Sequence, residues 1–319
     1  MNIVFMGTPD FAKESLQALV ENGHNIQLVI TNPDRPKGRG MKLQASPVKE
    51  YALEQKIEVE QPLKLKDNDE LIEKIKRCNP DVICVVAYGR IIPNSILEIP
   101  KIGCINVHGS LLPKYRGAAP IQWAVLNGDK TTGITTMFVN EKMDEGDILL
   151  KEEVEIGDNE TTGELWNRLS TIGANLLVQT LDKISNNDIV RIPQKTAGEA
   201  TYAPMLEKSM AEIKWNEQSA KEIKNLVRGL NPIMGAYTFI EKKKLKLWEI
   251  DILSNDNFQN EFDMLTSNLK NFSNGEIVLI NKKNMYIKAK DAIIVPIEVQ
   301  PENSRKMKIE EFLAGFKKN

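Results

Sequence analysis

The sequence lacks several features that would assign it to a special class of protein. It has no apolar run near the ~20 residues that cross a bilayer, so no membrane span is predicted. It does not start with a basic segment followed by an apolar one, so no secretory signal is predicted. Its cysteines, Cys78, Cys84 and Cys104, are odd in number and lack the spacing of metal ligands. We therefore expect a cytoplasmic protein with no membrane partner and no bound metal.

Histidine is also scarce, because the chain contains only His24 and His108. A site that needs a group titrating near neutral pH therefore has few candidates. The 319 residues are enough for two domains, and the net charge of −2 gives no global sign of nucleic-acid binding. The charge is uneven, however, with a net of −5 over residues 1–208 and of +3 over residues 209–319.

Short apolar strands alternate with amphipathic helices over the first ~180 residues, which predicts a Rossmann-like, doubly wound and mostly parallel α/β sheet. The strands are expected at 3–6, 26–31, 81–87, 103–107, 133–139 and 148–154. The first turn, Gly7-Thr8-Pro9-Asp10, is not the Gly-x-Gly-x-x-Gly that lets a dinucleotide approach the backbone, and no Walker motif is present. The sheet is therefore predicted without a nucleotide fingerprint.

The remainder of the chain has a different pattern. Residues 188–207 are polar and irregular and are predicted to be a linker between domains at 1–187 and 208–319. Short strands separated by turn residues predict that the second domain is a small β-barrel, for which the oligonucleotide-binding (OB) type is one fitting architecture. These strands are expected at 211–215, 236–240, 244–253, 275–280, 285–289 and 292–299, with helices at 220–229 and 308–316.

The most informative segment is 103–120, where an apolar run ends in Asn106 and His108. Residues i and i+2 of a strand point to the same face, so these two side chains should lie side by side at the strand end, where open α/β sheets bind ligands. A lone histidine in such a place is also compatible with a purely structural role. A second loop, 140–147, carries Asp144, which could orient or charge the imidazole; a solvated turn carboxylate is the alternative.

The run Asn106-Val107-His108-Gly109-Ser110-Leu111-Leu112-Pro113 resembles the signature of 10-formyltetrahydrofolate-dependent formyltransferases. Further segments are similar to the branch of this family that formylates charged initiator tRNA, and the resemblance extends from residue 2 to about residue 316. These segments are Met6-Gly7-Thr8-Pro9-Asp10-Phe11, Asn32-Pro33-Asp34-Arg35-Pro36, Gly38-Arg39-Gly40, Ser46-Pro47-Val48-Lys49, Arg116-Gly117-Ala118-Ala119-Pro120-Ile121-Gln122, Thr201-Tyr202-Ala203 and Asn231-Pro232.

The resemblance implies a reaction and its residues. The formyl group of 10-formyltetrahydrofolate would be transferred to the α-amino group of methionine on initiator methionyl-tRNA. The product, N-formylmethionyl-tRNA, would be used for translation initiation. The catalytic residues would be Asn106, His108 and Asp144, and the first domain would hold this centre while the barrel binds tRNA. The folate would lie against Ser110, Leu111, Leu112 and Pro113, and against Arg90, Ile91 and Ile92.

The loop 32–49 is the second candidate for function, because it is long and strongly basic. The resemblance implies that Arg35, Lys37, Arg39 and Lys42 bind the tRNA acceptor end, with Arg39 central. A mobile solvated loop is the alternative.

The sequence leaves two other functions open. One is a small-molecule formyltransferase of the same fold, acting on an amino sugar or on glycinamide ribonucleotide. The other is a folate- or RNA-binding module with a dead site. The extension past residue 208 and the basic loop disfavour the first, and the intact Asn106, His108 and Asp144 disfavour the second. We expect a monomer.

Overall fold

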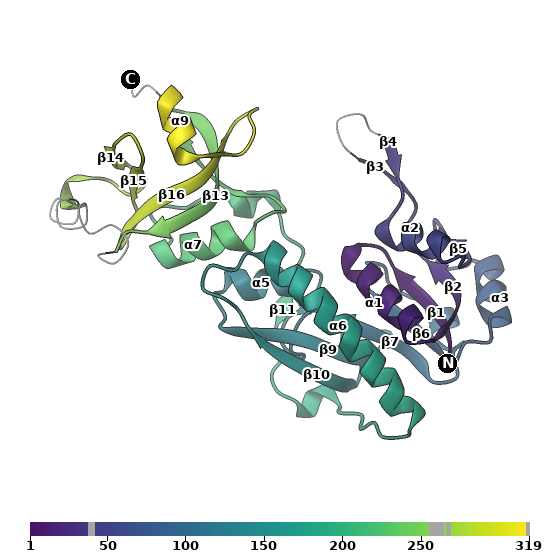
Figure 1. The fold of residues 1–319 in the computed structure, drawn as a ribbon. Coiled ribbons are helices and arrows are strands. Elements are labelled where there is room, and N and C mark those ends of the chain that lie inside the picture. Colours follow the sequence, from purple (N-terminus) through teal and green to yellow (C-terminus); the bar gives the residue numbers. More distant parts are fainter. Residues whose placement is uncertain (38–41, 255–264, 266–268, 317–319) are drawn as a thin grey trace. The chain divides into compact units, whose positions relative to one another are not determined.

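The computed structural model describes residues 1–37, 42–254, 265 and 269–316 of the chain (Figure 1). They form two compact units. Unit 1 contains Met1–Ile121, Thr131–Glu155 and Trp166–Met205, and unit 2 contains Gln122–Lys130, Ile156–Leu165 and Leu206–Asn319. Two short stretches that precede residue 187 in the sequence thus belong to unit 2.

Unit 1 is built on a seven-stranded sheet with the strand order β10-β9-β7-β6-β1-β2-β5. The strands are β1 (Asn2–Gly7), β2 (Asn25–Ile30), β5 (Val59–Glu60), β6 (Val82–Val86), β7 (Gly103–His108), β9 (Thr131–Phe138) and β10 (Ile148–Glu155). All neighbours are parallel except β7 with β9 and β9 with β10. All five residues of β6 are buried, as its continuous apolar sequence predicts for a strand covered on both faces. The predicted mostly parallel sheet is confirmed.

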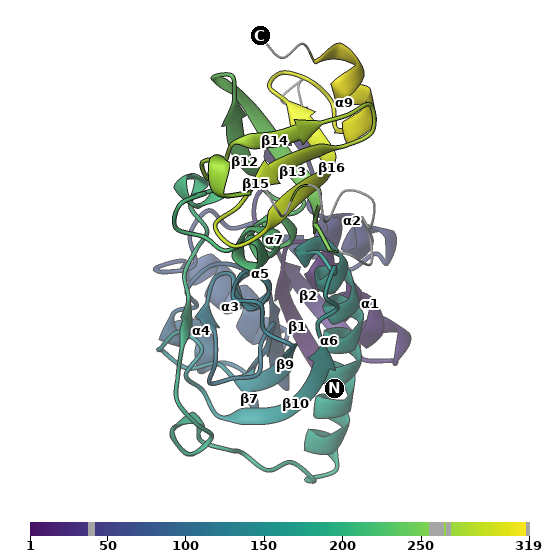
Figure 2. The same cartoon turned by 90° about the vertical axis from the view of Figure 1, so that its left-hand side faces the viewer.

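Helices cover both faces of this sheet (Figure 2). They are α1 (Asp10–Glu21), α2 (Pro47–Glu54), α3 (Asp69–Arg77), α4 (Asn94–Leu97) and α6 (Thr162–Ser185). The short helix α5 (Pro120–Leu126) follows Arg116–Gly117 in the chain. On one face, α3 and α4 bury Leu71, Ile75 and Ile96 against β1, β2 and β6. On the other face, α1 and α6 meet where the rings of Phe11 and Trp166 lie 5.1 Å apart, edge to face.

Two pairs of short strands in unit 1 differ from the predictions. No strand was predicted in the basic loop 32–49, but β3 (Arg35–Lys37) and β4 (Lys42–Gln44) pair there as an antiparallel hairpin. The alternating polar and apolar residues there are too few to reveal a strand. Elsewhere β8 (Arg116–Gly117) pairs in parallel with β11 (Tyr202–Ala203).

Unit 2 contains a curled antiparallel sheet with the order β12-β13-β16-β15-β14, and β17 pairs with β16. The strands are β12 (Ala236–Ile240), β13 (Lys243–Ile252), β14 (Ile277–Ile280), β15 (Met285–Lys288), β16 (Ile293–Pro301) and β17 (Met307–Lys308). The helices α7 (Ala220–Gly229) and α9 (Ile309–Gly315) pack on its apolar core, and Ser219 and Glu222 form a capping box at the start of α7.

The strand predicted at 211–215 is wrong. A short 3-10 helix (η2, Lys208–Ala211) ends at the first residue of this segment, and only a single bridge, between Glu212 and Tyr237, follows. Ala211 and Ile213 are both buried in the core, as residues two positions apart in a strand would be. The chain turns away at Lys214, whose backbone N–H donates to the side chain of Gln218, so the ladder ends.

Cys84 in β6 and Cys104 in β7 are both buried. Burial raises the pKa of the Cys104 thiol to about 12, so it stays protonated at neutral pH. Across the residues that the structure describes, none of the helices is both long and apolar enough to cross a membrane.

Candidate active site

The carboxyl end of β7 presents the two predicted side chains on one face. Val107 points to the face of the sheet that α6 covers. Asn106 and His108 point to the opposite face, the same one as Cys104, which lies in the core under α4. His108 is the last residue of β7 and is 5% exposed, whereas Asn106 is half-buried. The strand therefore delivers both side chains to the edge of the sheet where the prediction placed a ligand.

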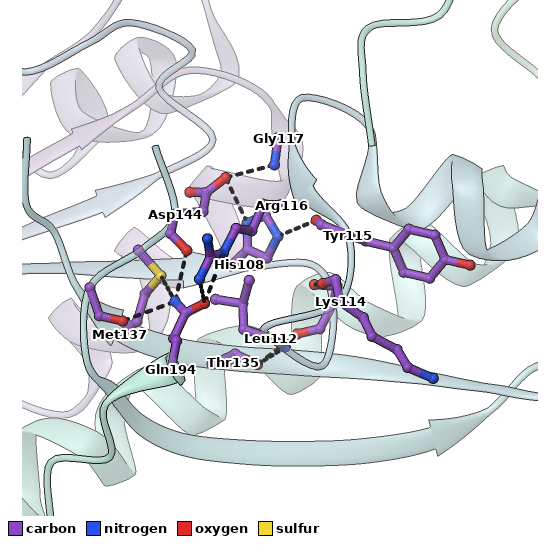
Figure 3. Close-up of polar contacts among 12 residues, drawn as sticks. His108, Leu112, Lys114, Tyr115, Arg116, Gly117, Thr135, Met137, Asp144 and Gln194 are labelled. Atoms are coloured by element: carbon purple, nitrogen blue, oxygen red, sulfur yellow. Dashed lines mark hydrogen bonds and ion pairs between the residues drawn. The ribbon is translucent and has the colours of Figure 1, made fainter. Parts of the chain in front are cut away.

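His108 is held between two acceptors (Figure 3). Its Nε2 lies 2.8 Å from the backbone carbonyl oxygen of Tyr115. A carbonyl can only accept, so Nε2 carries the proton. On the other side of the ring, Nδ1 lies 3.7 Å from Oδ2 of Asp144. The structure thus brings together His108 and Asp144, which are far apart in the sequence.

Asp144 lies in a turn that aims its carboxylate at the ring. Its φ of +53° is in the left-handed region, and its Oδ2 accepts from the backbone N–H of Gly117 at 2.8 Å. Gly146 follows two residues after Asp144. It has no room for a side chain, because a Cβ there would lie 1.7 Å from the carbonyl oxygen of Phe138. Position 146 therefore requires glycine for the loop to keep this path.

Asn106 supplies a donor that is not committed elsewhere. In the described part of the chain, its carboxamide has no hydrogen-bond partner, and it is not sealed from solvent. A neutral amide can donate to an anion without titrating itself. The arrangement of a free amide next to a histidine-carboxylate pair suits a reaction in which a carbonyl oxygen gains charge while protons move.

The residues Ser110 to Pro113 form a tight loop after β7. The Ser110 hydroxyl donates to the carbonyl of Lys114 at 2.6 Å, and Thr135 accepts from the N–H of Leu112 at 3.1 Å. Leu112 is fully buried with Met137 and Ile148, and Pro113 is buried too, whereas Leu111 is half-buried. The side chains of Ser110 and Leu112 thus shape the loop from inside the protein.

A shallow pocket of about 440 Å³ adjoins Arg90 and Ile91. Ile91 is 80% exposed, whereas Ile92 is buried. Arg90 donates to the carbonyls of Pro62 and Leu63 at 2.9 and 3.2 Å. The pocket is lined by Leu63, Lys64, Leu65, Lys66, Asp67, Arg90 and Ile91, so cations outnumber the one acid there.

The base of the β3–β4 hairpin is fixed by one carboxylate. Asp34 accepts from Lys49 Nζ at 2.7 Å and from Gln61 Nε2 at 2.7 Å. These hydrogen bonds, the Lys49 one first, hold the pKa of Asp34 below its usual range. Arg35 is exposed on β3, Lys37 and Lys42 lie at the ends of the paired strands, and Arg39 lies outside the described residues.

Sequence reasoning missed two buried polar residues beside this centre, Arg116 and Gln194, which are 9% and 3% exposed. In the sequence, Arg116 stands out only as part of a motif, and Gln194 lies in the segment predicted to be a linker. An isolated polar residue in a polar segment gives no signal of burial. As for metals, the described ranges contain no group of three or more histidine, cysteine or acidic side chains able to hold an ion.

Comparison with known proteins covers both parts of the chain. Residues 1–181 match the family described as formyl transferase, and residues 205–317 match the formyl transferase C-terminal domain. Methionyl-tRNA formyltransferase of Acetivibrio thermocellus is 46% identical over 317 residues, which is 99% of this chain and 97% of the relative. The enzyme of that name from Clostridioides difficile is 45% identical over 315 residues, with the same coverage.

Solved structures share the fold at low identity. The sugar 3N-formyl transferase WlaRD, crystallised with dTDP and 5-N-formyl-THF, has a TM-score of 0.66 and 20% identity, covering 96% of this chain and 99% of its own. HypX from Aquifex aeolicus in complex with tetrahydrofolic acid has a TM-score of 0.64 and 15% identity, covering 99% of this chain and 47% of its own.

Proposed function

The chain belongs to the methionyl-tRNA formyltransferase family, and on this premise we propose that it transfers the formyl group of 10-formyltetrahydrofolate to the α-amino group of methionine on initiator methionyl-tRNA. The observation that carries the proposal is the free amide of Asn106 beside the His108–Asp144 pair at the end of β7. We place the reaction there, in the cytoplasm, in a monomeric enzyme.

The transfer is an attack by a neutral amine on an amide-like carbonyl. Negative charge develops on the carbonyl oxygen, and a preorganised donor at that oxygen lowers the barrier by roughly 3–4 kcal/mol. Asn106 takes this role, because its carboxamide is accessible and uncommitted within the described chain. It does not change its charge state as the reaction proceeds.

Protons must also move, since the amine loses one and the leaving nitrogen gains one. His108 is the group that holds and passes a proton, with its Nδ1 facing Asp144 at 3.7 Å and its Nε2 facing the Tyr115 carbonyl at 2.8 Å. Asp144 stabilises the protonated ring and fixes its orientation.

The folate fits the pocket beside Arg90 and Ile91 by its chemistry. Leu63 and Ile91 offer exposed apolar surface for the planar part of the molecule. Lys64, Lys66 and Arg90 offer positive charge for the glutamyl carboxylates. The side chains of Ser110, Leu112, Pro113 and Ile92 are buried, so these residues meet the folate through their backbone, whereas the half-buried Leu111 can also offer its side chain.

The tRNA is the partner for the basic hairpin, through Arg35, Lys37, Arg39 and Lys42. Contacts to phosphates give affinity that falls with salt, and an unpaired acceptor end offers bases that a protein can read. The anchor of Lys49 and Gln61 on Asp34 supports a hairpin that is held at its base while its tip meets the tRNA.

A direct assay separates this proposal from its alternatives. Purified protein is mixed with 10-formyltetrahydrofolate and charged initiator tRNA, charged elongator tRNA, a dTDP-amino sugar or glycinamide ribonucleotide in parallel. We expect formylmethionine on the initiator tRNA. Formylation of a small molecule alone would favour a small-molecule formyltransferase, and no product with any acceptor would favour a dead binding module.

A further inference from the structure

We propose that Gln194 is a positioning residue that holds Asp144 in register with His108. The inference rests on the proposed function, because Asp144 matters there as the partner of the histidine. Gln194 begins a short 3-10 helix (η1, Gln194–Thr196) that follows α6, 50 positions after Asp144 and 78 positions after Arg116. Its side chain is buried, and Figure 3 shows its amide joined by hydrogen bonds to Arg116 and to the backbone of Asp144.

The hydrogen bonds of Gln194 fix which way its amide points. Its Oε1 accepts from Nε and Nη2 of Arg116 at 3.0 and 2.8 Å. Its Nε2 donates to the carbonyls of Asp144 and Gly146 at 2.7 and 2.9 Å. The guanidinium can only donate and the carbonyls can only accept, so the reverse orientation would place like against like. All four hydrogen-bonding positions of the amide are used.

These bonds restrain the turn on both sides of Glu145. Asp144 has a left-handed φ, a conformation that costs energy for a residue other than glycine and persists only where its surroundings impose it. Arg116 also pairs with the carboxylate of Glu145 at 3.2 Å. With the carbonyls of Asp144 and Gly146 tied to one amide, the Asp144 side chain stays directed at Gly117 and His108.

The residues just before Gln194 bind the two ends of the same loop. The guanidinium of Arg191 lies over the ring of Phe138, 4.1 Å from its centre. Ile192 exchanges two backbone hydrogen bonds with Ile148, each 2.9 Å long. The segment 191–194 therefore contacts the loop 138–148 at its first residue, at its last residue and at the turn that carries Asp144.

Gln194→Glu is the diagnostic substitution, because it keeps the size of the side chain and its contact with Arg116. A carboxylate lacks the two N–H donors and would put an oxygen against the carbonyls of Asp144 and Gly146. Displacing a reacting group by about 1 Å costs on the order of 100-fold in rate. We expect Gln194→Glu to lower kcat 10- to 100-fold and to change the KM values for folate and tRNA less than threefold.

The test is a double-mutant cycle with Asp144→Asn, measured by formylation of initiator methionyl-tRNA. If Gln194 acts through Asp144, Gln194→Glu will cost less than threefold in the Asp144→Asn background. The matched control is Thr180→Val, which removes a fully buried hydroxyl bonded to Thr136 in the same unit without contacting the turn. This control should lower thermal stability and leave kcat within twofold of the parent.

A second readout needs no substrate. The chain has only two histidines, so the ring resonances of His108 can be followed by NMR after assignment with His24→Gln. We expect Gln194→Glu to move them toward their positions in Asp144→Asn, and Thr180→Val to leave them in place. Unmoved resonances, or equal losses of kcat in both backgrounds, would overturn the role of Gln194. A failure of the proposed function would differ, because the parent protein would then form no formylmethionine or Asp144→Asn would keep full activity.

Discussion

Nδ1 of His108 lies 3.7 Å from Oδ2 of Asp144, while the opposite nitrogen of the ring is bonded to the carbonyl of Tyr115. A neutral ring with its proton on Nε2 turns a lone pair toward the carboxylate. A ring with both nitrogens protonated turns a donor toward each acceptor. This geometry supports our proposal that His108 holds and passes a proton during the reaction.

The first prediction concerns this charge. Asp144→Asn keeps the shape of the side chain and removes its negative charge, so we expect kcat to fall about 100-fold, within the range of general acid–base catalysis. Steady-state kinetics with both substrates will check this, and the KM for folate should change little. Asp147→Asn is the control, since Asp147 is a carboxylate of the same loop that forms no ion pair with His108 in the described structure. Loss of activity in both variants alike would argue against a specific role for Asp144.

The second prediction concerns the amide of Asn106. Asn106→Asp has the same size but no N–H donor, and Asn106→Ala has no polar group, so both should lower kcat by about 10²- to 10³-fold. Folate affinity, measured by fluorescence titration, should stay within a few-fold of the parent. Turnover near the parent value in either variant would remove Asn106 from the proposed oxyanion site.

Much of this site could be predicted because the signals are local. The apolar run into Asn106 and His108 requires a strand, and strand geometry alone puts both side chains on one face. The buried Val82–Val86 run likewise requires a strand covered on both faces, and the structure confirms it. The family resemblance added Asp144, which sequence patterns alone would leave as a turn carboxylate.

The remainder depends on contacts between distant residues. The burial of Gln194 follows from its pairing with Arg116, 78 positions away, and nothing in its own segment indicates that. The hairpin follows from Arg35 pairing with Gln44 across strands of only three residues. The wrongly predicted strand at 211–215 is the reverse case, in which the alternation of Ala211 and Ile213 indicates a ladder that the turn at Lys214 ends.

The third prediction concerns the basic hairpin. Arg39→Ala should raise the KM for initiator methionyl-tRNA and lower kcat, because interactions made only in the productive complex affect both. If Arg39 binds one phosphate, the slope of log affinity against log salt should become shallower by about 1 in the variant. Arg77→Ala is the control, an arginine at the end of α3 that should leave tRNA kinetics unchanged. Equal salt slopes for the parent and Arg39→Ala would indicate a solvated loop.

The fourth prediction concerns stability and pH. The Nε2 atom of His24 is buried without a hydrogen-bond partner among the described residues. Burial and the nearby amino terminus lower the pKa of His24 below 6.5, against a smaller opposing effect of Asp182. As the pH falls through 6.5, the unfolded chain takes up a proton at this ring more readily than the folded one, so folding loses stability. Above that pH the ring is neutral in both states and contributes no dependence.

His24→Gln cannot take up this proton, and the carboxylates that also titrate on acidification are the same in both proteins. The free energy of unfolding, measured by urea titration with circular dichroism, should therefore fall less between pH 7.5 and pH 5.5 in His24→Gln than in the parent. Parallel pH profiles for the two proteins would show that the ring is as free to protonate in the folded state as in the unfolded chain.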